Sequence, residues 1–152
     1  MMKKEDLNAL KDKIVKIALE NNFITGIILF GSIARSEENE KSDIDLLILW
    51  EDLKVEDSYS YIYKILSKYF PHKSLTILDM EYSSFFNIKK ATPLYLNIIW
   101  DGFIIYDKHG KLHDFLLKIR RELKAKGFER KKIGKYYFWE LPKPGQKVEL
   151  TI

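Results

Sequence analysis

Two kinds of hydrophobic pattern alternate along the chain, and together they predict an α/β fold. In some segments apolar residues recur every three or four positions, the period of one helix face; Leu7, Leu10, Ile14 and Ile17 form the first such series. In others, such as Ile24–Phe30, apolar and β-branched residues follow one another almost without interruption, which is typical of a strand covered on both faces. We expect helices over residues 5–21, 57–70, 93–101 and 111–126, strands over 24–30, 43–50, 75–78 and 103–106, and a short helix capped by Ser32.

The segments between and after these elements are polar or irregular. Ser36–Ser42 is polar throughout and is expected to be a loop. The segment Ile133–Ile152 contains Lys-Pro-Gly at residues 143–145, and we interpret it as a terminal hairpin. No internal repeat or long linker is visible, so a single domain is expected, with a core over residues 1–107 and a C-terminal basic helix and tail over 108–152 packed on it.

Composition excludes several classes of protein. The 152 residues are 46% hydrophobic and 32% charged, which excludes disordered and low-complexity chains. No apolar run approaches the roughly 18 residues of a membrane span, and the amino terminus is charged where a signal peptide has its apolar stretch. A cytoplasmic protein without a membrane partner is therefore expected. The absence of cysteine excludes disulfides and Cys-ligated zinc, so oxygen atoms or the three histidines must hold any metal.

Charge is distributed unevenly. Residues 1–107 contain 13 Lys or Arg against 17 Asp or Glu, whereas residues 108–152 contain 13 against 5. Within this basic tail, Arg130 and its neighbouring lysines stand beside four aromatic residues, Tyr136 to Trp139. Such a cluster can bind RNA by stacking and charge, but aromatic residues at this density more often pack a tail onto the sheet, and we favour packing.

The stretch Leu29–Leu49 contains the residues with the clearest chemistry. A buried strand leads into Gly31 and Ser32, and after ten intervening residues a second strand begins with Asp43-Ile44-Asp45. Because side chains alternate along a strand, Asp43 and Asp45 lie on the same face with Cα atoms about 6.5 to 7 Å apart. Paired acids also occur as solubilising or capping residues. Here the Gly-Ser turn, which lets a phosphate approach the backbone, favours a site for a divalent ion and a triphosphate.

This arrangement resembles the signature of the DNA polymerase β-like nucleotidyltransferase superfamily, and particularly its minimal nucleotidyltransferase branch. The matching residues are Gly31, Ser32, Ala34, Arg35, Ser42, Asp43, Ile44, Asp45 and Leu46. The resemblance implies a mixed β-sheet packed by helices, and Mg²⁺-dependent transfer of a nucleoside monophosphate from an NTP such as ATP to a hydroxyl, with release of pyrophosphate. It further implies that Gly31, Ser32 and Arg35 hold the nucleotide, and that Asp43 and Asp45 are the catalytic ligands of Mg²⁺ or Mn²⁺.

One position departs from the family pattern, in which the next strand of the sheet carries a third carboxylate. Strand-to-strand alignment places Thr76 there, with Asp79 and Glu81 as the nearest acids. Either one of these acids substitutes, or the chain is a non-catalytic NTP-binding or protein- or RNA-binding module. The resemblance leaves the hydroxyl acceptor open: related domains include antitoxins that modify a tyrosine on a HEPN-type partner, and others that adenylylate small molecules.

Overall fold

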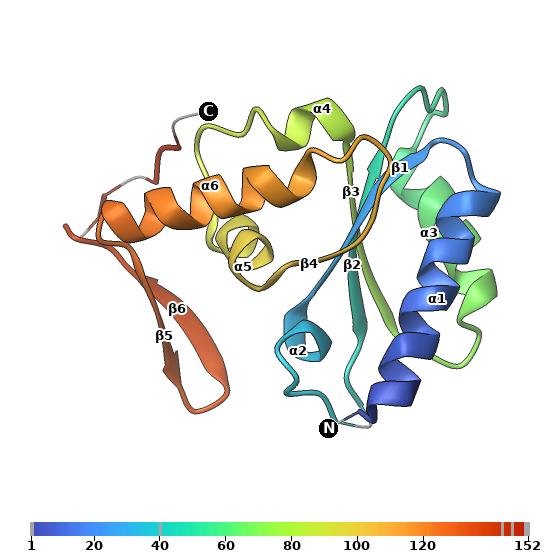
Figure 1. Ribbon diagram of the computed structural model, residues 1–152, viewed down its shortest axis with the longest axis horizontal. Coiled ribbons are helices and arrows are strands. Elements are labelled where there is room, and N and C mark those ends of the chain that lie inside the picture. Colours follow the sequence, from blue (N-terminus) through green and yellow to red (C-terminus); the bar gives the residue numbers. More distant parts are fainter. Residues whose placement is uncertain (1, 40, 144, 147, 151–152) are drawn as a thin grey trace.

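A mixed four-stranded sheet in the order β3-β2-β1-β4 forms the centre of the molecule (Figure 1). The computed structural model describes residues 2–39, 41–143, 145–146 and 148–150. The strands are β1 (Ile24–Phe30), β2 (Ile44–Trp50), β3 (Leu75–Glu81) and β4 (Phe103–Asp107). β1 is antiparallel to both β2 and β4, whereas β2 and β3 are parallel. The expected mixed sheet is therefore confirmed.

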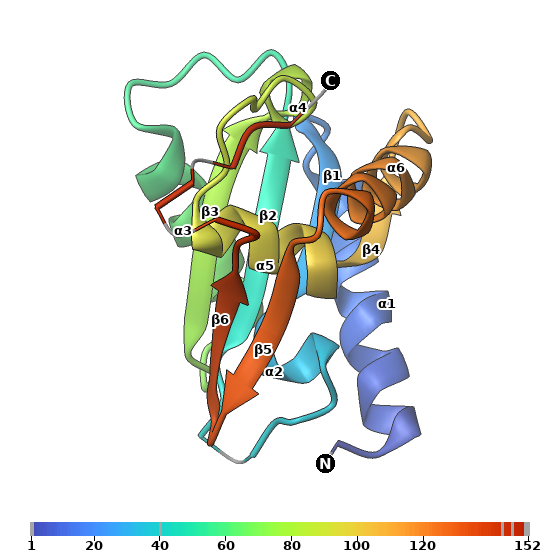
Figure 2. The ribbon, with the colours of Figure 1, turned by 90° about the vertical axis from the view of Figure 1, so that its left-hand side faces the viewer.

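Helices cover both faces of this sheet (Figures 1 and 2). On one face, α1 (Lys4–Glu20) and α3 (Ser58–Tyr69) pack on a core that includes Ile14, Leu46 and Ile62. On the other, α5 (Pro93–Asp101) and α6 (Leu112–Ala125) pack with Leu47 and Leu49. Every residue of β1 is buried, because this strand is central and covered on both sides. The near-continuous apolar run at residues 24–30 follows from that position.

Two one-turn helices follow strands directly. α2 (Gly31–Ala34) continues from β1, and α4 (Tyr82–Phe85) continues from β3. The predicted cap is wrong: Ser32 lies inside α2, whose N-cap residue is Phe30 with no side-chain hydrogen bond to the helix. The sequence pattern does not predict α4, because a single Tyr-Ser-Ser-Phe turn is too short to show a helical period. β3 also continues to Glu81, three residues beyond its predicted end. The other main elements agree with their predicted bounds to within a residue.

The predicted hairpin over Ile133–Ile152 is wrong in position. The hairpin consists of β5 (Glu129–Ile133) and β6 (Tyr136–Glu140), and it turns at Gly134 and Lys135. Gly134 has a φ angle of +60°, a left-handed conformation that glycine adopts at little cost and that suits the first position of a two-residue hairpin turn. Lys143 and Gly145 follow the hairpin, and Pro144 lies outside the described residues.

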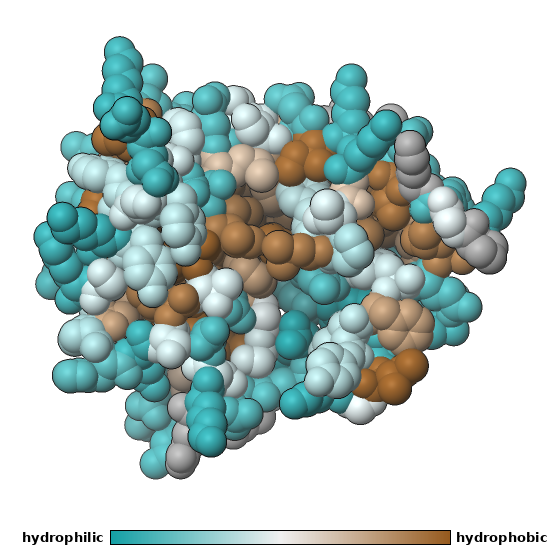
Figure 3. Space-filling view, turned by 180° about the vertical axis from the view of Figure 1, so that it is seen from behind, coloured by the Kyte–Doolittle hydropathy of each residue, from teal (hydrophilic) through white to brown (hydrophobic). Residues whose placement is uncertain are grey.

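The molecular surface shows where this hairpin leaves apolar side chains exposed. Ile133, Tyr136 and Phe138 are 69%, 70% and 39% exposed. In the space-filling view from behind, apolar side chains gather on the hairpin at the right and in the middle of the face (Figure 3). Across the described residues, no helix combines the length and the hydropathy needed to cross a bilayer.

Candidate functional site

The residues of the sequence motif meet at one end of the neighbouring strands β1, β2 and β3. Register pairs Asp45 of β2 with Phe30 at the end of β1 on one side and with Thr76 of β3 on the other. Gly31 follows Phe30 directly, and Asp43 precedes the first residue of β2. Three strands therefore bring Gly31, Asp43, Asp45 and Thr76 together, although they span 46 positions of the sequence.

Gly31 lies directly against the Asp45 carboxylate. Its φ angle is +73°, which L side chains rarely adopt, and a Cβ atom added there would lie 1.8 Å from Asp45 Oδ2. Only glycine satisfies both conditions. The backbone of the Gly-Ser turn and the carboxylate consequently share one small space, as a site that binds both a phosphate and its metal ion requires.

Asp43 and Asp45 form a carboxylate pair on the same sheet face. The hydroxyl of Thr76 donates a 3.0 Å hydrogen bond to Asp43 Oδ2. Burial raises the pKa of the Asp45 carboxyl; the Asp43 charge adds to the increase, while the Thr76 hydroxyl and the Arg35 guanidinium oppose it. Without a cation, the pair is thus an electrostatically unfavourable arrangement.

Among the residues that the structure describes, the third acid of the family pattern has no equivalent on this face. Thr76 faces the carboxylate pair, whereas Asp79 and Glu81 are odd-numbered residues of β3 and point to the opposite face. The Asp79 carboxylate also accepts hydrogen bonds from Trp50 Nε1 at 3.0 Å and from Ser58 Oγ at 2.6 Å. Neither acid on β3 is placed to substitute for the missing ligand.

The described residues fit a divalent cation held by two carboxylates. Mg²⁺ and Mn²⁺ take oxygen ligands and commonly keep waters or bind phosphate oxygens. A cation between Asp43 and Asp45 would also offset both the burial of the Asp45 carboxylate and the Asp43 charge, which together raise the Asp45 pKa. Within the described part of the chain, no group of three or more His, Asp or Glu residues converges. The protein would therefore supply two ligands, and water and nucleotide the others.

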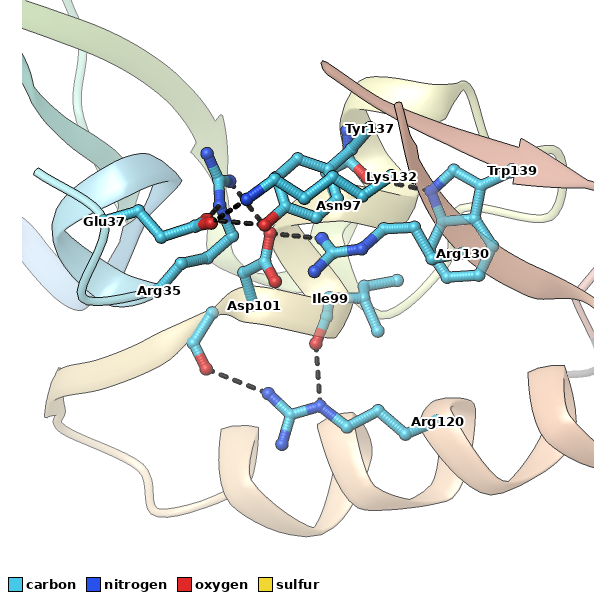
Figure 4. A network of polar contacts seen from close by, with 11 residues as sticks. Arg35, Glu37, Asn97, Ile99, Asp101, Arg120, Arg130, Lys132, Tyr137 and Trp139 are labelled. Atoms are coloured by element: carbon cyan, nitrogen blue, oxygen red, sulfur yellow. Dashed lines mark hydrogen bonds and ion pairs between the residues drawn. The ribbon is translucent and has the colours of Figure 1, made fainter. Parts of the chain in front are cut away.

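Ser32 and Arg35, the other predicted nucleotide-binding residues, follow Gly31 in and after α2. The Ser32 carbonyl accepts a 2.8 Å hydrogen bond from the Glu37 amide, which closes the loop after the turn. Arg35 donates from Nε to Glu37 at 2.7 Å and from Nη1 to Asp101 at 3.2 Å (Figure 4). Arg35 thus has a defined orientation beside the site.

An apolar groove continues from the carboxylate pair along the same face. Leu47 lies two residues beyond Asp45 on β2, and Leu78 lies two residues beyond Thr76 on β3. Together with Met80 and Ile98 they line a groove of about 360 Å³.

The partners of Arg35 are functional candidates that the sequence does not reveal. Asp101 ends α5, 66 positions from Arg35, and nothing in its local pattern distinguishes it from a helix-terminal acid. The predicted basic cluster is also mostly paired: Arg130 contacts Asp101, Lys132 contacts Glu37 and Lys131 contacts Glu140. This pairing supports the packing interpretation of the tail.

Glu37 is expected to stay ionised to low pH. Hydrogen bonds from Lys132, Tyr137 and Arg35 lower its pKa to about 2 from an ordinary value of 4.5. Because the folded-state pKa is lowered, its contribution to stability is complete above about pH 4.5 and is lost as the pH falls toward 2. We expect a ¹³C NMR titration of the Glu37 side chain to give a midpoint near 2, rising in a Tyr137→Phe variant. A midpoint near 4.5 in the wild type would contradict the network.

Comparison with known proteins identifies the family to which this fold belongs. Residues 12–111 match the family described as Polymerase beta, Nucleotidyltransferase, and the chain belongs to that family. Two similar proteins of Methanocaldococcus jannaschii, MJ0604 and MJ0141, are each provisionally named a protein adenylyltransferase. MJ0604 is 32% identical over 104 residues, covering 68% of this chain and 93% of its own. MJ0141 is 37% identical over 67 residues, covering 44% and 58% respectively.

Solved structures share the fold. A chain of a toxin–antitoxin complex crystallised with AMP-PNP superposes with a TM-score of 0.52 at 18% identity, over 76% of this chain and 90% of that one. A chain of the MntA–HpeT complex, in a variant with two aspartates replaced by glutamates, gives the same TM-score at 17% identity and the same coverage. At these identities the similarity establishes the fold alone.

Proposed function

We propose that the chain transfers an adenylyl group from Mg²⁺-bound ATP to a hydroxyl group of a protein acceptor. The names of its two M. jannaschii relatives support a protein acceptor. The AMP-PNP in one structural neighbour's complex is an ATP analogue, and it supports ATP as the nucleotide. The contact of Gly31 with Asp45, next to Asp43, is the observation on which the proposal rests.

The bonds that change in this reaction involve the α-phosphorus of ATP. The acceptor oxygen forms a bond to it, the bond to the oxygen that bridges the α- and β-phosphates breaks, pyrophosphate leaves with that oxygen, and the acceptor proton passes to water. When bound, Mg²⁺ would supply charge neutralisation at the phosphate oxygens. Asp43 and Asp45 would hold it, while the Gly31–Ser32 backbone and Arg35 would orient the phosphates.

Thr76 favours a second candidate function. A neutral hydroxyl replaces an anionic ligand poorly, and electrostatic stabilisation of the transition state usually contributes more to catalysis than any other effect. With Asp79 and Glu81 on the other face, the chain would then bind ATP without transferring its adenylyl group. Incubation with Mg²⁺, α-labelled ATP and extract of the source organism separates the two: labelled protein with released pyrophosphate indicates transfer, whereas ATP bound without either product indicates a binding module.

A Thr76→Asp variant tests the position directly. We expect transfer to increase at least about tenfold, because a third carboxylate would complete the charge around the cation. A third acid also adds repulsion in the metal-free protein, so the Tm in EDTA should fall and recover when Mg²⁺ is added. Both quantities are measurable, by label transfer and by thermal melting.

The control for this variant is Thr76→Asn, which has a similar size and no charge. It should show neither the faster transfer nor the Mg²⁺-dependent recovery of Tm. If Thr76→Asp and Thr76→Asn behave alike, Thr76 does not occupy the place of the third ligand.

A further inference from the structure

The β5–β6 hairpin contacts the loop of the candidate site, although it lies outside residues 12–111, which match the family. Its strands alternate between two faces. Arg130, Lys132, Tyr137 and Trp139 face the body of the molecule, where Trp139 Nε1 donates a 2.8 Å hydrogen bond to Asn97 of α5 (Figure 4). The opposite face carries the exposed residues Ile133, Tyr136 and Phe138.

Asp101 of α5 connects the hairpin to Arg35. Its side chain is 5% exposed and is paired with two guanidinium groups, those of Arg35 and Arg130. The end of α5 that carries Asp101 is itself held by Arg120 of α6, which donates to the carbonyls of Ile99 at 2.8 Å and Gly102 at 2.9 Å. Because the Asp101 carboxylate is buried, pairs with two guanidinium groups and lies at a helix end held by Arg120, it fixes the positions of Arg35 and Arg130.

Tyr137 joins the hairpin to Arg35 and to Glu37. Its ring lies between two guanidinium groups, 4.5 Å from that of Arg35 and 4.3 Å from that of Arg130. Its hydroxyl donates a 2.6 Å hydrogen bond to Glu37, which also pairs with Lys132. Arg35 is consequently held from three directions, by Asp101, by Glu37 and by the Tyr137 ring.

These contacts leave one nitrogen of the Arg35 guanidinium, Nη2, for a ligand. Nε and Nη1 donate to Glu37 and Asp101, while Nη2 has no hydrogen-bond partner among the described residues. Arg35 also lies next to the Gly-Ser turn, because its backbone amide donates a 3.1 Å hydrogen bond to the Gly31 carbonyl. Its unpaired nitrogen and its charge are therefore available where the phosphates of a nucleotide would bind.

We propose that the β5–β6 hairpin positions Arg35 for the phosphates of the bound nucleoside triphosphate, with Tyr137 and Arg130 as the positioning residues. This inference rests on the proposed function, since it requires a triphosphate at Gly31 and Ser32. The hairpin lies outside the residues that match the family, and in this proposal its role is to fix the orientation of the Arg35 side chain.

The test compares two adjacent tyrosines. Tyr137→Phe removes the hydroxyl that binds Glu37, whereas Tyr136→Phe removes one that makes no hydrogen bond within the described residues, from a side chain on the outer face. Kd values for ATP and for AMP are measured with Mg²⁺ for the wild type and both variants. We expect Tyr137→Phe to weaken ATP binding about three- to tenfold and to leave AMP binding within twofold, because Arg35 acts on the phosphates that AMP lacks. Tyr136→Phe should change neither.

Equal weakening of ATP and AMP by Tyr137→Phe would mean that the hairpin only supports the fold, and it would overturn the inference. So would an unchanged ATP affinity. Tyr137→Phe should also have no further effect in an Arg35→Lys background, where the forked guanidinium is already absent; a persistent effect there would show that Tyr137 acts through another group. If the wild type binds no nucleotide at all, the proposed function itself fails. If the wild type binds ATP and Tyr137→Phe binds it equally well, only the inference about the hairpin fails.

Discussion

An Asp45→Asn variant is expected to lose nucleotidyl transfer by about a hundredfold or more without losing stability. Removing one preorganised electrostatic group commonly costs a factor of about 10² to 10³, and Asp45 is one of only two carboxylates that face the proposed cation within the described residues. In the metal-free protein the same carboxyl is destabilised by burial and by Asp43, as its raised pKa shows. A neutral amide relieves both effects, so the Tm in EDTA should stay equal or rise.

The measurements are the rate of label transfer from ATP and the Tm with and without Mg²⁺. Asp12→Asn is the matched control, because Asp12 is exposed on α1 and makes no ion pair or hydrogen bond within the described chain. It should leave the transfer rate and both Tm values unchanged. Wild-type transfer by Asp45→Asn would remove the carboxylate pair from the mechanism, and a large fall in Tm in EDTA would mean that Asp45 has a structural role.

Much of the site could be predicted from sequence because its geometry is local to two strands. The apolar runs at residues 24–30 and 43–50 each fix a strand buried on both faces, and the alternation of side chains then places Asp43 and Asp45 on one side. The parallel register that pairs Thr76 with Asp45 agrees with a simple strand-to-strand alignment. The replacement of the third carboxylate by Thr76 is therefore visible in the sequence itself.

The hairpin and its contacts could not be predicted in the same way. Both Gly134-Lys135 and Lys143-Pro144-Gly145 are possible turns, and the choice between them depends on which register lets Arg130 and Trp139 face α5. That choice is made by pairs such as Tyr137 with Glu37, which lie 100 positions apart. A local pattern carries no information on such pairs, so Arg130 and Tyr137 appear in the sequence only as a basic and aromatic cluster.

A Gly31→Ala variant is expected to lose ATP binding by at least about a hundredfold and to lower the Tm. The backbone at Gly31 has a φ angle of +73°, which costs an alanine about 1–2 kcal/mol. The added methyl group would also lie 1.8 Å from Asp45 Oδ2, so the turn and the carboxylate must move apart. Since the phosphates and the cation are proposed to bind between these two groups, a small displacement removes the site.

Gly110→Ala separates the two effects, because Gly110 has a nearly identical φ angle of +71° and nothing within 4 Å of an added Cβ atom. It introduces the same backbone strain in the loop between β4 and α6, far along the chain from the motif. Both variants should therefore share the part of the Tm decrease that comes from the backbone, and only Gly31→Ala should weaken ATP binding, as measured by titration calorimetry with Mg²⁺. If Gly31→Ala binds ATP as well as Gly110→Ala does, the close approach of the turn to Asp45 is not part of the nucleotide site, and the phosphates must bind elsewhere on the sheet edge.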